Sequence, residues 1–477
     1  MLIKSNAQEN KKSLILAGGG MRLAYQAGVL IALDEQGVSF NHVDGTSGGI
    51  FNAGMLASGR NPHEIAERWR KLKMKNFMSM RPLKNYFKPL NMMGYADADG
   101  IRNKIFPALG INIEKINGFN QGDITFNVCN FSEKTIEAIP NNQAWEDHLV
   151  AGVSLPIVMP GIQIKEQWYS DAVWIKDANL MEAVNRGADE LWLVWAIGNT
   201  ETYLPGALNQ YVHMIEMSAN GGLLEEYARI DMINKQIEQG HSESGQKTPV
   251  KLFVIKPEFP LPLDPDLFFN KIDARSLINM GYVDAKTSLK SLPSDGLPMD
   301  KEATKMKNPG VRLNMRNQFH GTISNNEDES KVSFYTYMVL SAQNDGDILK
   351  IYSSVSFEVL GKEVPCFNHL VKSAKVEGEK LLELTCSFVH KNDKYMLTAS
   401  WKLGSVVDWL LGLEFKYVDV SIAKADENED RMEGRLYQDI KERADSWYST
   451  NIRRQDGKSG GIGLKYRMGL KLMNYEI

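Results

Sequence analysis

A serine flanked by glycines is the first feature of the sequence with clear chemical potential. Ser47 lies in the stretch Gly45-Thr46-Ser47-Gly48-Gly49, which has the pattern Gly-x-Ser-x-Gly. Between a strand and a helix, this pattern is typical of a nucleophile elbow, because small neighbours permit the sharp turn that exposes the hydroxyl. The stretch therefore favours Ser47 as a nucleophile over a solvated serine in a glycine-rich turn.

Three consecutive glycines, Gly18, Gly19 and Gly20, come earlier in the chain, after the apolar run SLILA. A dinucleotide-binding fingerprint requires Gly-x-Gly-x-x-Gly, but Leu23 occupies the third glycine position, and no stretch has the spacing of a Walker phosphate loop. An oxyanion site remains, because N–H groups at the end of a strand and the start of a helix bind negative charge. Arg22 would add a fixed cation or an anchoring hydrogen-bond donor.

A serine nucleophile needs a base, and histidine is the usual one. None of the eight histidines lies in a context typical of a triad, and His42, just before Ser47, is expected to pack or cap. Asp171, in the segment YSDAVWIKDANL, is the better candidate. A carboxylate can take the serine proton directly when burial raises its pKa towards the working pH. Spacing alone nevertheless favours an ordinary turn aspartate at this position.

The elements that must hold these residues follow from apolar periodicity. Residues 13–17 are predicted to form a buried strand, and residues 21–36 a helix that ends at Gly37. A second strand is predicted at residues 40–44, before a helix that starts near Gly48. Alternating strands and helices of this kind indicate a parallel sheet. Further strands are predicted in the segments DITFNVCNF, DELWLVWAI and PVKLFVIKP.

The length of 477 residues suggests two or three domains. Residues 1–295 are predicted to form one α/β domain, followed by a linker rich in proline, glycine and charge. Residues 306–477 contain alternating segments such as VSFYTYMVLSA and KYMLTASWKL, which predict a smaller, mostly antiparallel β-rich domain of unknown role. The tail from Arg453 to Ile477 is expected to be loosely ordered.

Charge, cysteine content and hydropathy indicate which partners and which cellular location to expect. The formal net charge is −4, so no nucleic-acid partner is expected. The three cysteines, Cys129, Cys366 and Cys386, lack metal-ligand spacing and predict buried, reduced thiols. No secretory signal and no apolar run of bilayer-spanning length is present, so a cytoplasmic protein is expected. The oligomeric state is not indicated.

One basic segment could bring such a protein to a membrane surface. Residues 68–88 contain eight basic side chains and no acidic one, interleaved with Trp, Met, Phe and Tyr. Such a mixture suits peripheral contact with an anionic lipid surface. It fits equally well a solvated helix that is held by buried aromatic anchors.

Taken with their order, these motifs resemble those of the patatin-like phospholipases, a family of serine lipid acyl hydrolases. The family's glycine-triplet motif corresponds to GGGMRLAYQAGVL, and its nucleophile elbow to GTSGGIFNAGMLASG. The segment LVAGVSLPIVMPGIQI stands where the family has Ala-Ser-x-Ser-x-Pro, and YSDAVWIKDANLMEAVNRGADELWLV corresponds to its aspartate motif. The resemblance covers about residues 12–290. It implies a three-layer α/β/α domain with a mainly parallel central sheet.

The resemblance also implies roles for individual residues. Ser47 corresponds to the nucleophile and Asp171 to its base, forming a dyad without histidine. The glycines 18–20 correspond to the oxyanion loop, and Arg22 to the arginine that accompanies it. The implied reaction is phospholipase A-like cleavage of carboxylic esters in membrane lipids, through an acyl-enzyme on Ser47. It needs no metal and no cofactor.

Three positions depart from the family's pattern and keep alternatives open. Ala172 and Leu23 stand where the family usually has glycine, and Asn179 stands where proline is common. Glycine can adopt a positive φ that alanine adopts only at a cost, so Ala172 favours a catalytically inactive lipid-binding or regulatory relative. A serine peptidase is a third class, and it predicts a histidine beside Ser47.

Overall fold

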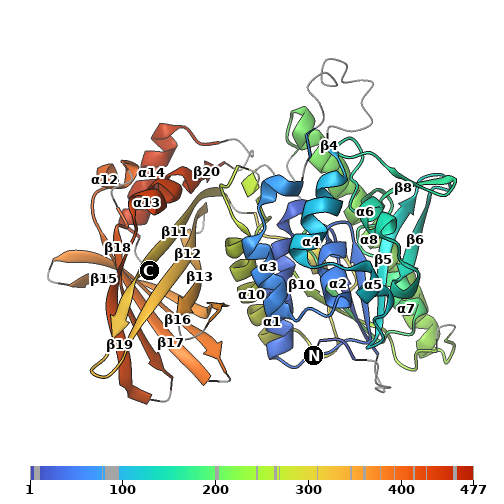
Figure 1. The fold of residues 1–477 in the computed structure, drawn as a ribbon, viewed down its shortest axis with the longest axis horizontal. Helices are drawn as coiled ribbons and strands as arrows, with labels where there is room; N and C mark the ends of the chain where they lie inside the picture. Colours follow the sequence, from blue (N-terminus) through green and yellow to red (C-terminus); the bar gives the residue numbers. More distant parts are fainter. Residues whose placement is uncertain are drawn as a thin grey trace. The chain divides into compact units, whose positions relative to one another are not determined.

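The computed structural model describes residues 2–4, 11–77, 79–80, 96–198, 203–242, 245–262, 266–267, 269–308, 310–343, 346–357, 361–376, 378–391, 393–411, 414–425, 427–454 and 459–475. The chain divides into two compact units (Figure 1). The first contains Met1–Phe268 and Asp284–Lys307, and the second contains Phe269–Val283 and Asn308–Ile477. Helix α10, Ala274–Ser291, contributes residues to both units.

The first unit is built on an eight-stranded sheet of order β10-β9-β1-β2-β5-β8-β7, with β6 paired to β5. Strands β10, β9, β1, β2 and β5 run parallel, whereas β6, β7 and β8 make antiparallel pairs. Every residue of β2 is buried, as expected for a strand covered on both faces. The prediction of a mainly parallel sheet is therefore confirmed. The strands are β1 (Lys12–Leu16), β2 (His42–Thr46), β5 (Asp123–Asn130), β6 (Thr135–Pro140), β7 (Ile162–Ile164), β8 (Gln167–Asp171), β9 (Glu190–Val194) and β10 (Lys251–Ile255), and β3 (Ser79–Met80) pairs with β4 (Ala96–Asp97) apart from this sheet.

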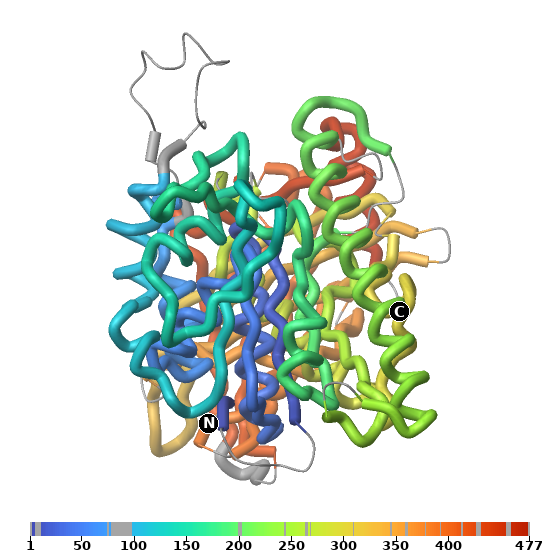
Figure 2. Tube along the Cα trace, turned by 90° about the vertical axis from the view of Figure 1, so that its right-hand side faces the viewer, coloured from blue at the N-terminus to red at the C-terminus, as the bar shows by residue number. Residues whose placement is uncertain are grey.

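Helices form the outer layers of this unit, and Figure 2 shows green α8 on one side of the sheet and blue and cyan segments on the other. On the α8 side, Leu223 and Ile230 pack in one apolar cluster with Ile15 and Leu191 of the sheet. The predicted helix at 21–36 is present as η1 followed by α1, and Gly37 ends it with a φ of 68°. The helical elements are η1 (Gly20–Leu23), α1 (Ala24–Glu35), α2 (Gly49–Ala57), α3 (Pro62–Lys71), η2 (Met74–Phe77), η5 (Ile101–Ile105), α4 (Phe106–Leu109), α5 (Ile113–Asn117), η6 (Asn141–Gln143), α6 (Glu146–Gly152), η7 (Ala172–Trp174), α7 (Leu180–Asn185), α8 (Ala207–Glu238) and α11 (Lys301–Thr304).

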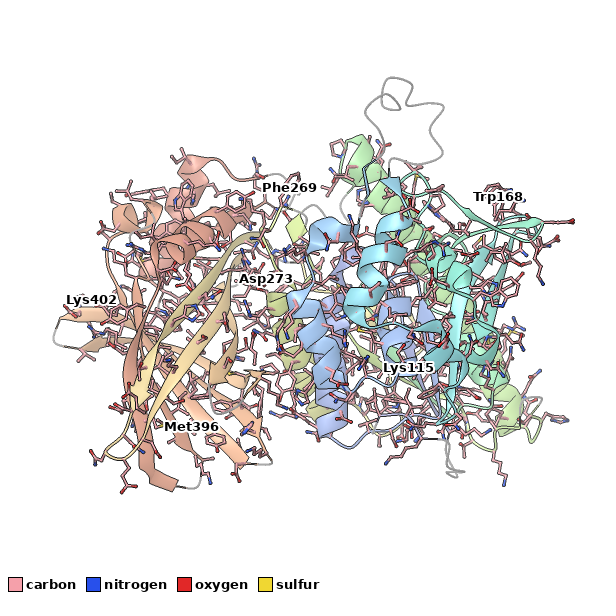
Figure 3. All side chains as sticks on the ribbon, in the orientation of Figure 1. Lys115, Trp168, Phe269, Asp273, Met396 and Lys402 are labelled. Carbon is pink, nitrogen blue, oxygen red and sulfur yellow. The ribbon has the colours of Figure 1, made fainter. Side chains whose placement is uncertain are left out.

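The second unit is a ten-stranded sheet of order β14-β13-β12-β11-β19-β18-β17-β16-β15, with β20 paired to β11. All of its strand pairs are antiparallel, so the β-rich C-terminal fold is confirmed. In β17, Leu397 and Trp401 are buried, whereas Met396 and Lys402 point outward (Figure 3). The strands are β11 (Val311–Ser324), β12 (Glu329–Gln343), β13 (Gly346–Phe357), β14 (Glu363–Pro365), β15 (Phe367–Val376), β16 (Glu379–His390), β17 (Asp393–Leu403), β18 (Tyr417–Lys424), β19 (Glu427–Tyr437) and β20 (Asn451–Arg453).

The prediction of a loosely ordered tail is wrong for residues 453–454 and 459–475, while residues 455–458 and 476–477 lie outside the described residues. The second unit also contains helices α12 (Val406–Leu410), α13 (Ile440–Ser449) and α14 (Ile462–Met473). Met468 and Leu472 of α14 lie one helical turn apart and are buried in the apolar cluster of the β-sheet. These apolar contacts, rather than the basic side chains of the tail, decide its structure.

The basic segment 68–88 is described only in part. Residues 78 and 81–88 lie outside the described residues. Within α3, Trp69 is fully buried and its indole N–H donates to Asn52 Oδ1 at 2.8 Å, so this aromatic side chain anchors its helix. None of the helices in the described part of the chain combines the length and the apolar character that a bilayer crossing requires.

Candidate active site

The first two parallel strands bring the glycine triplet and the serine to one edge of the sheet. Leu16 of β1 lies opposite Gly45 of β2, so the loops that follow these strands leave the sheet side by side. Farther along the sheet, Thr46 pairs with Asn127 of β5. The next residue of β5, Val128, pairs with Asp171 at the end of β8. This register places the predicted nucleophile and the predicted base across a single intervening strand.

Ser47 occupies a sharp turn between β2 and α2, as the elbow pattern predicts. Its φ is 51°, a left-handed conformation that costs a non-glycine residue about 1–3 kcal/mol and is common at functional sites. A Cβ on Gly49 would lie 2.0 Å from the carbonyl oxygen of Leu16, and one on Gly48 would lie 2.7 Å from that of Gly20. Both positions therefore require glycine, because the turn packs directly against the backbone.

Ser47 and Asp171 form a direct hydrogen-bonded pair. Ser47 Oγ donates to Asp171 Oδ2 at 2.6 Å, and the N–H of Val173 donates to Asp171 Oδ1 at 2.9 Å. Asp171 is 1% exposed and Ser47 is 8% exposed. Burial is the main cause that raises the pKa of Asp171 to about 7, and the two hydrogen bonds oppose it. A carboxyl group with this pKa can exchange a proton with the serine near neutral pH.

His42, the histidine nearest to Ser47 in sequence, has a structural role. Its ring lies 3.0 Å from Ser13 Oγ and 2.8 Å from Thr125 Oγ1, deep in the sheet. Burial lowers the pKa of His42 to about 3, so it stays uncharged at neutral pH. The expectation that His42 packs rather than acts as a base agrees with these contacts.

The segment before β8 fixes the backbone at Asp171. The N–H of Asp171 donates to the carbonyl oxygen of Ser154 at 3.1 Å, and Ser154 Oγ donates to the carbonyl oxygen of Val150 at 2.7 Å. Ser154 is fully buried in the segment LVAGVSLPIVMPGIQI. The sequence places this segment before Asp171. It does not indicate that the carbonyl oxygen of Ser154 accepts the N–H of Asp171.

Helix α8 holds the loop that follows Asp171, a role that no pattern in the sequence indicated. Ser218 Oγ donates to the carbonyl oxygen of Val173 at 2.9 Å. Farther along the helix, Glu226 accepts from Lys176 Nζ at 2.6 Å and from the N–H of Met181 at 2.7 Å. The helix therefore fixes this loop at three points, which lie on either side of the buried Asp177.

Gly222 lies between these contacts and offers a test of the role of α8. A Cβ at this position would lie 2.8 Å from the backbone oxygen of Ile175, so Gly222→Ala must displace the loop. We expect a loss of about 1–3 kcal/mol in the free energy of unfolding and a fall in kcat of roughly ten- to a hundredfold.

Gly221→Ala is the matched control, because an added Cβ there has nothing within 4 Å. It should preserve kcat and raise stability by about 0.5–1 kcal/mol, since alanine is the better helix former. Both variants are measured for kcat and for unfolding in urea. Equal kcat values for Gly222→Ala and Gly221→Ala would contradict a positioning role for α8.

The first residue of the glycine loop uses its N–H group within the protein. The N–H of Gly18 donates to Asp177 Oδ2 at 3.0 Å, so this donor is already used. Gly20 begins η1, and the first N–H groups of a helix have no partner within that helix. Arg22 Nε donates to the carbonyl oxygen of Gly19 at 2.8 Å, so Arg22 anchors the loop. Gly19 and Gly20 are therefore the glycines whose N–H groups remain suited to an oxyanion.

The departures from the family's pattern fit the structure without strain. Ala172 is buried at the start of η7, and its φ is not positive. Alanine therefore costs nothing at this position, and the argument for an inactive relative from Ala172 is removed. Leu23 is fully buried before α1. Asn179 precedes α7, and its Nδ2 donates to Asn127 Oδ1 at 2.9 Å.

A buried polar network supports the elbow from within the sheet. Asp44 Oδ1 accepts from Asn127 Nδ2 at 2.5 Å, and Asp44 Oδ2 accepts from Thr125 Oγ1 at 2.6 Å. Asn127 Nδ2 also donates to the side chain of Thr46 at 2.8 Å, which explains a polar residue beside the nucleophile. Burial raises the pKa of Asp44 to about 7.

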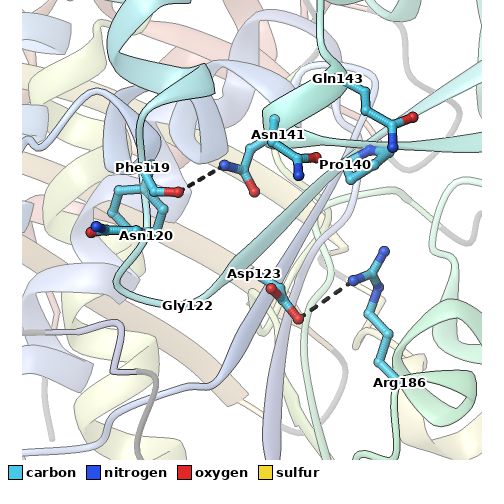
Figure 4. A pocket seen from close by; sticks show the side chains of 9 residues that line it. Phe119, Asn120, Gly122, Asp123, Pro140, Asn141, Gln143 and Arg186 are labelled. Atoms are coloured by element: carbon cyan, nitrogen blue, oxygen red, sulfur yellow. Dashed lines mark hydrogen bonds and ion pairs between the residues drawn. The ribbon is translucent and has the colours of Figure 1, made fainter.

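A separate hollow of about 440 Å³ lies at the other edge of the sheet (Figure 4). Its wall includes Asp123, the first residue of β5, which pairs with the first residue of β2, His42. Ser47 follows the last residue of the same parallel strand, so this hollow is not part of the serine site. Asp123 pairs with Arg186 at 3.5 Å, and Asn141 Nδ2 donates to the carbonyl oxygen of Phe119 at 3.0 Å.

Within the described residues, no group of three or more His, Cys, Asp or Glu side chains is arranged to hold a metal ion. The three cysteines are free and buried, as predicted.

This fold and site define an α/β domain with a serine–carboxylate pair at the edge of a parallel sheet. Residues 14–184 match the family described as patatin-like phospholipase. Over 194 residues, the chain is 27% identical to a lysophospholipase, NTE1, of Lodderomyces elongisporus. That match covers 40% of this chain but only 13% of the length of the relative.

Proposed function

We propose that this protein is a serine lipid acyl hydrolase of the phospholipase A type, which cleaves carboxylic esters of membrane lipids. The observation that carries the proposal is the 2.6 Å hydrogen bond from Ser47 Oγ to the buried carboxylate of Asp171. The patatin-like domain at residues 14–184 supports a lipid ester as the substrate. Residues 1–295 are proposed as the hydrolase domain, and residues 306–477 as a β-rich domain of separate role.

The proposed reaction has two steps. Asp171 takes the Ser47 proton as Oγ attacks the ester carbonyl, and the N–H groups of Gly19 and Gly20 receive the negative charge that develops on the carbonyl oxygen. The alcohol leaves with the proton from Asp171, and the acyl group stays on Ser47. Water then gives a proton to Asp171, attacks the acyl-enzyme and releases the fatty acid, and Asp171 returns the proton to Ser47 Oγ.

Fatty acid release from defined lipids tests the proposal. Vesicles of phosphatidylcholine and dispersions of lysophosphatidylcholine are incubated with wild-type protein and with Ser47→Ala, and free fatty acid is measured by mass spectrometry. Release by the wild type alone is expected. Wild-type protein that binds vesicles in co-sedimentation but releases no fatty acid from either lipid would instead establish the lipid-binding alternative.

Peripheral contact with membranes and a cytoplasmic location are part of the same proposal. The basic side chains of residues 68–88 would be attracted by anionic headgroups, and salt weakens such attraction. Co-sedimentation with vesicles that contain anionic lipid should therefore fall as the salt concentration rises.

A further inference from the structure

Asp177 is a second buried carboxyl group at the site, and the mechanism above does not use it. It is fully buried, and its Oδ2 accepts the N–H of Gly18 at 3.0 Å. Its other oxygen, Oδ1, is also buried and has no hydrogen-bond partner among the described residues. An unpaired oxygen of a buried carboxyl group is costly and calls for an explanation.

The unpaired oxygen of Asp177 and the side chain of Ser47 both lie beside Gly18 of the glycine loop. A Cβ built on Gly18 would lie 2.2 Å from Asp177 Oδ1 and 2.8 Å from Ser47 Cβ. One carbon atom would therefore touch both side chains. Gly18 lacks that carbon, and its absence leaves room for the carboxyl group of Asp177 and the side chain of Ser47 beside the same residue of the loop.

The charges around Asp177 favour its uncharged form. Burial and the nearby carboxylate of Asp171 raise its pKa well above the usual range, while the Gly18 N–H and the cation of Arg22 oppose this change. Two buried carboxyl groups in one site do not readily ionise together. Since Asp171 must be ionised to take the serine proton, the proton of the pair resides on Asp177.

We propose that Asp177 is a positioning residue of the oxyanion loop, where it acts as an uncharged carboxylic acid. One oxygen accepts the Gly18 N–H and holds the loop against Ser47, and the other presents a hydroxyl donor beside the nucleophile. This inference rests on the proposed function and adds a third buried group to the serine–aspartate pair. It also explains why Gly18 is needed although its N–H is not a free donor.

The same substitution at the two aspartates tests this assignment. Asparagine reproduces both the acceptor and the donor of an uncharged acid, so Asp177→Asn should keep kcat and KM for ester hydrolysis within about threefold of wild type. Asp177→Leu removes both groups and should lower kcat by about 10²- to 10³-fold, with little change in KM. Asp171→Asn is the control, because there the ionised form is required and the substitution should be severe.

Thermal unfolding between pH 4 and pH 8 gives a second readout that does not depend on turnover. The folded protein keeps the Asp177 proton that the unfolded chain loses above about pH 4, so the contribution of Asp177 to stability falls as the pH rises. Asparagine does not titrate, so Asp177→Asn lacks this decrease in stability. The difference in Tm between Asp177→Asn and wild type should therefore grow, in favour of the variant, towards pH 8.

The outcomes separate the inference from the proposed function. A loss in Asp177→Asn as large as that in Asp171→Asn, or a Tm advantage that does not grow with pH, overturns the assignment. So does an unchanged kcat in folded Asp177→Leu. A wild-type protein that hydrolyses no ester would instead refute the proposed function, and the unfolding series would still decide whether Asp177 is uncharged.

Discussion

Ser47→Ala is expected to reduce ester hydrolysis by about 10⁴- to 10⁶-fold, which in practice means to background. The substitution removes the only atom of this side chain that can carry the acyl group, so no acyl-enzyme can form. The fold should persist, because the turn is fixed by the close packing of Gly48 and Gly49 on the backbone of β1 and the glycine loop. Steady-state hydrolysis and circular dichroism of the same preparation measure both expectations.

Ser58→Ala is the matched control for this variant. Ser58 follows the end of α2, is 3% exposed, and accepts the N–H of Asn112 at 3.0 Å. It is thus a buried, hydrogen-bonded serine near the same helix, and its loss should leave kcat unchanged. Hydrolysis by well-folded Ser47→Ala at the rate of the Ser58→Ala control would exclude Ser47 as the nucleophile.

Asp171→Asn is expected to lower kcat by about 10²- to 10⁴-fold, the usual range for the loss of a general base. The amide can still accept the serine hydroxyl, but it cannot take its proton. In wild type the base must be ionised, and burial raises its pKa to about 7. Activity should therefore fall about tenfold for each pH unit below 7 and level off above it. The residual activity of Asp171→Asn should lack this acid limb.

The same variant should not be less stable at alkaline pH. The folded pKa of Asp171 lies above its ordinary value of 3.8, so the contribution of Asp171 to stability is greatest at low pH and falls as the pH rises from about 4 to 7. Asp171→Asn removes this fall, and its Tm at pH 8 should equal or exceed that of wild type. Near-native turnover in this variant would show that another group is the base, and each histidine would then need testing.

The turn that holds Ser47 could be predicted because its signals are local. The elbow glycines and the triplet lie in short stretches whose residue types have a direct physical meaning, whereas Asp171 was singled out by the order of the motifs and not by its spacing. The strand–helix alternation also predicted the sheet, and hence the common edge at which Gly18 and Ser47 meet. The catalytic roles of these residues stay predictions that the experiments above can decide.

Contacts between distant segments could not be predicted in this way. Gly18 and Asp177 are 159 positions apart, and no local pattern indicates that one binds the other. The contacts of Glu226 with Lys176 and Met181 likewise depend on how α8 crosses the sheet. The prediction about the tail failed for a different reason. It relied on the basic residues of the tail and overlooked the helical spacing of Met468 and Leu472, which are buried.

Covalent labelling by a fluorophosphonate is the most direct test of the claim that Ser47 is a nucleophile activated by Asp171. Wild-type protein is treated with the probe between pH 5 and pH 9, and the adduct is located by intact mass and peptide mapping. We expect one adduct, on the peptide that contains Ser47, with a labelling rate that rises through about pH 7. Ser47→Ala should not be labelled, and Asp171→Asn should be labelled slowly at every pH. No adduct on folded wild-type protein, or an adduct on a different residue, would contradict the account.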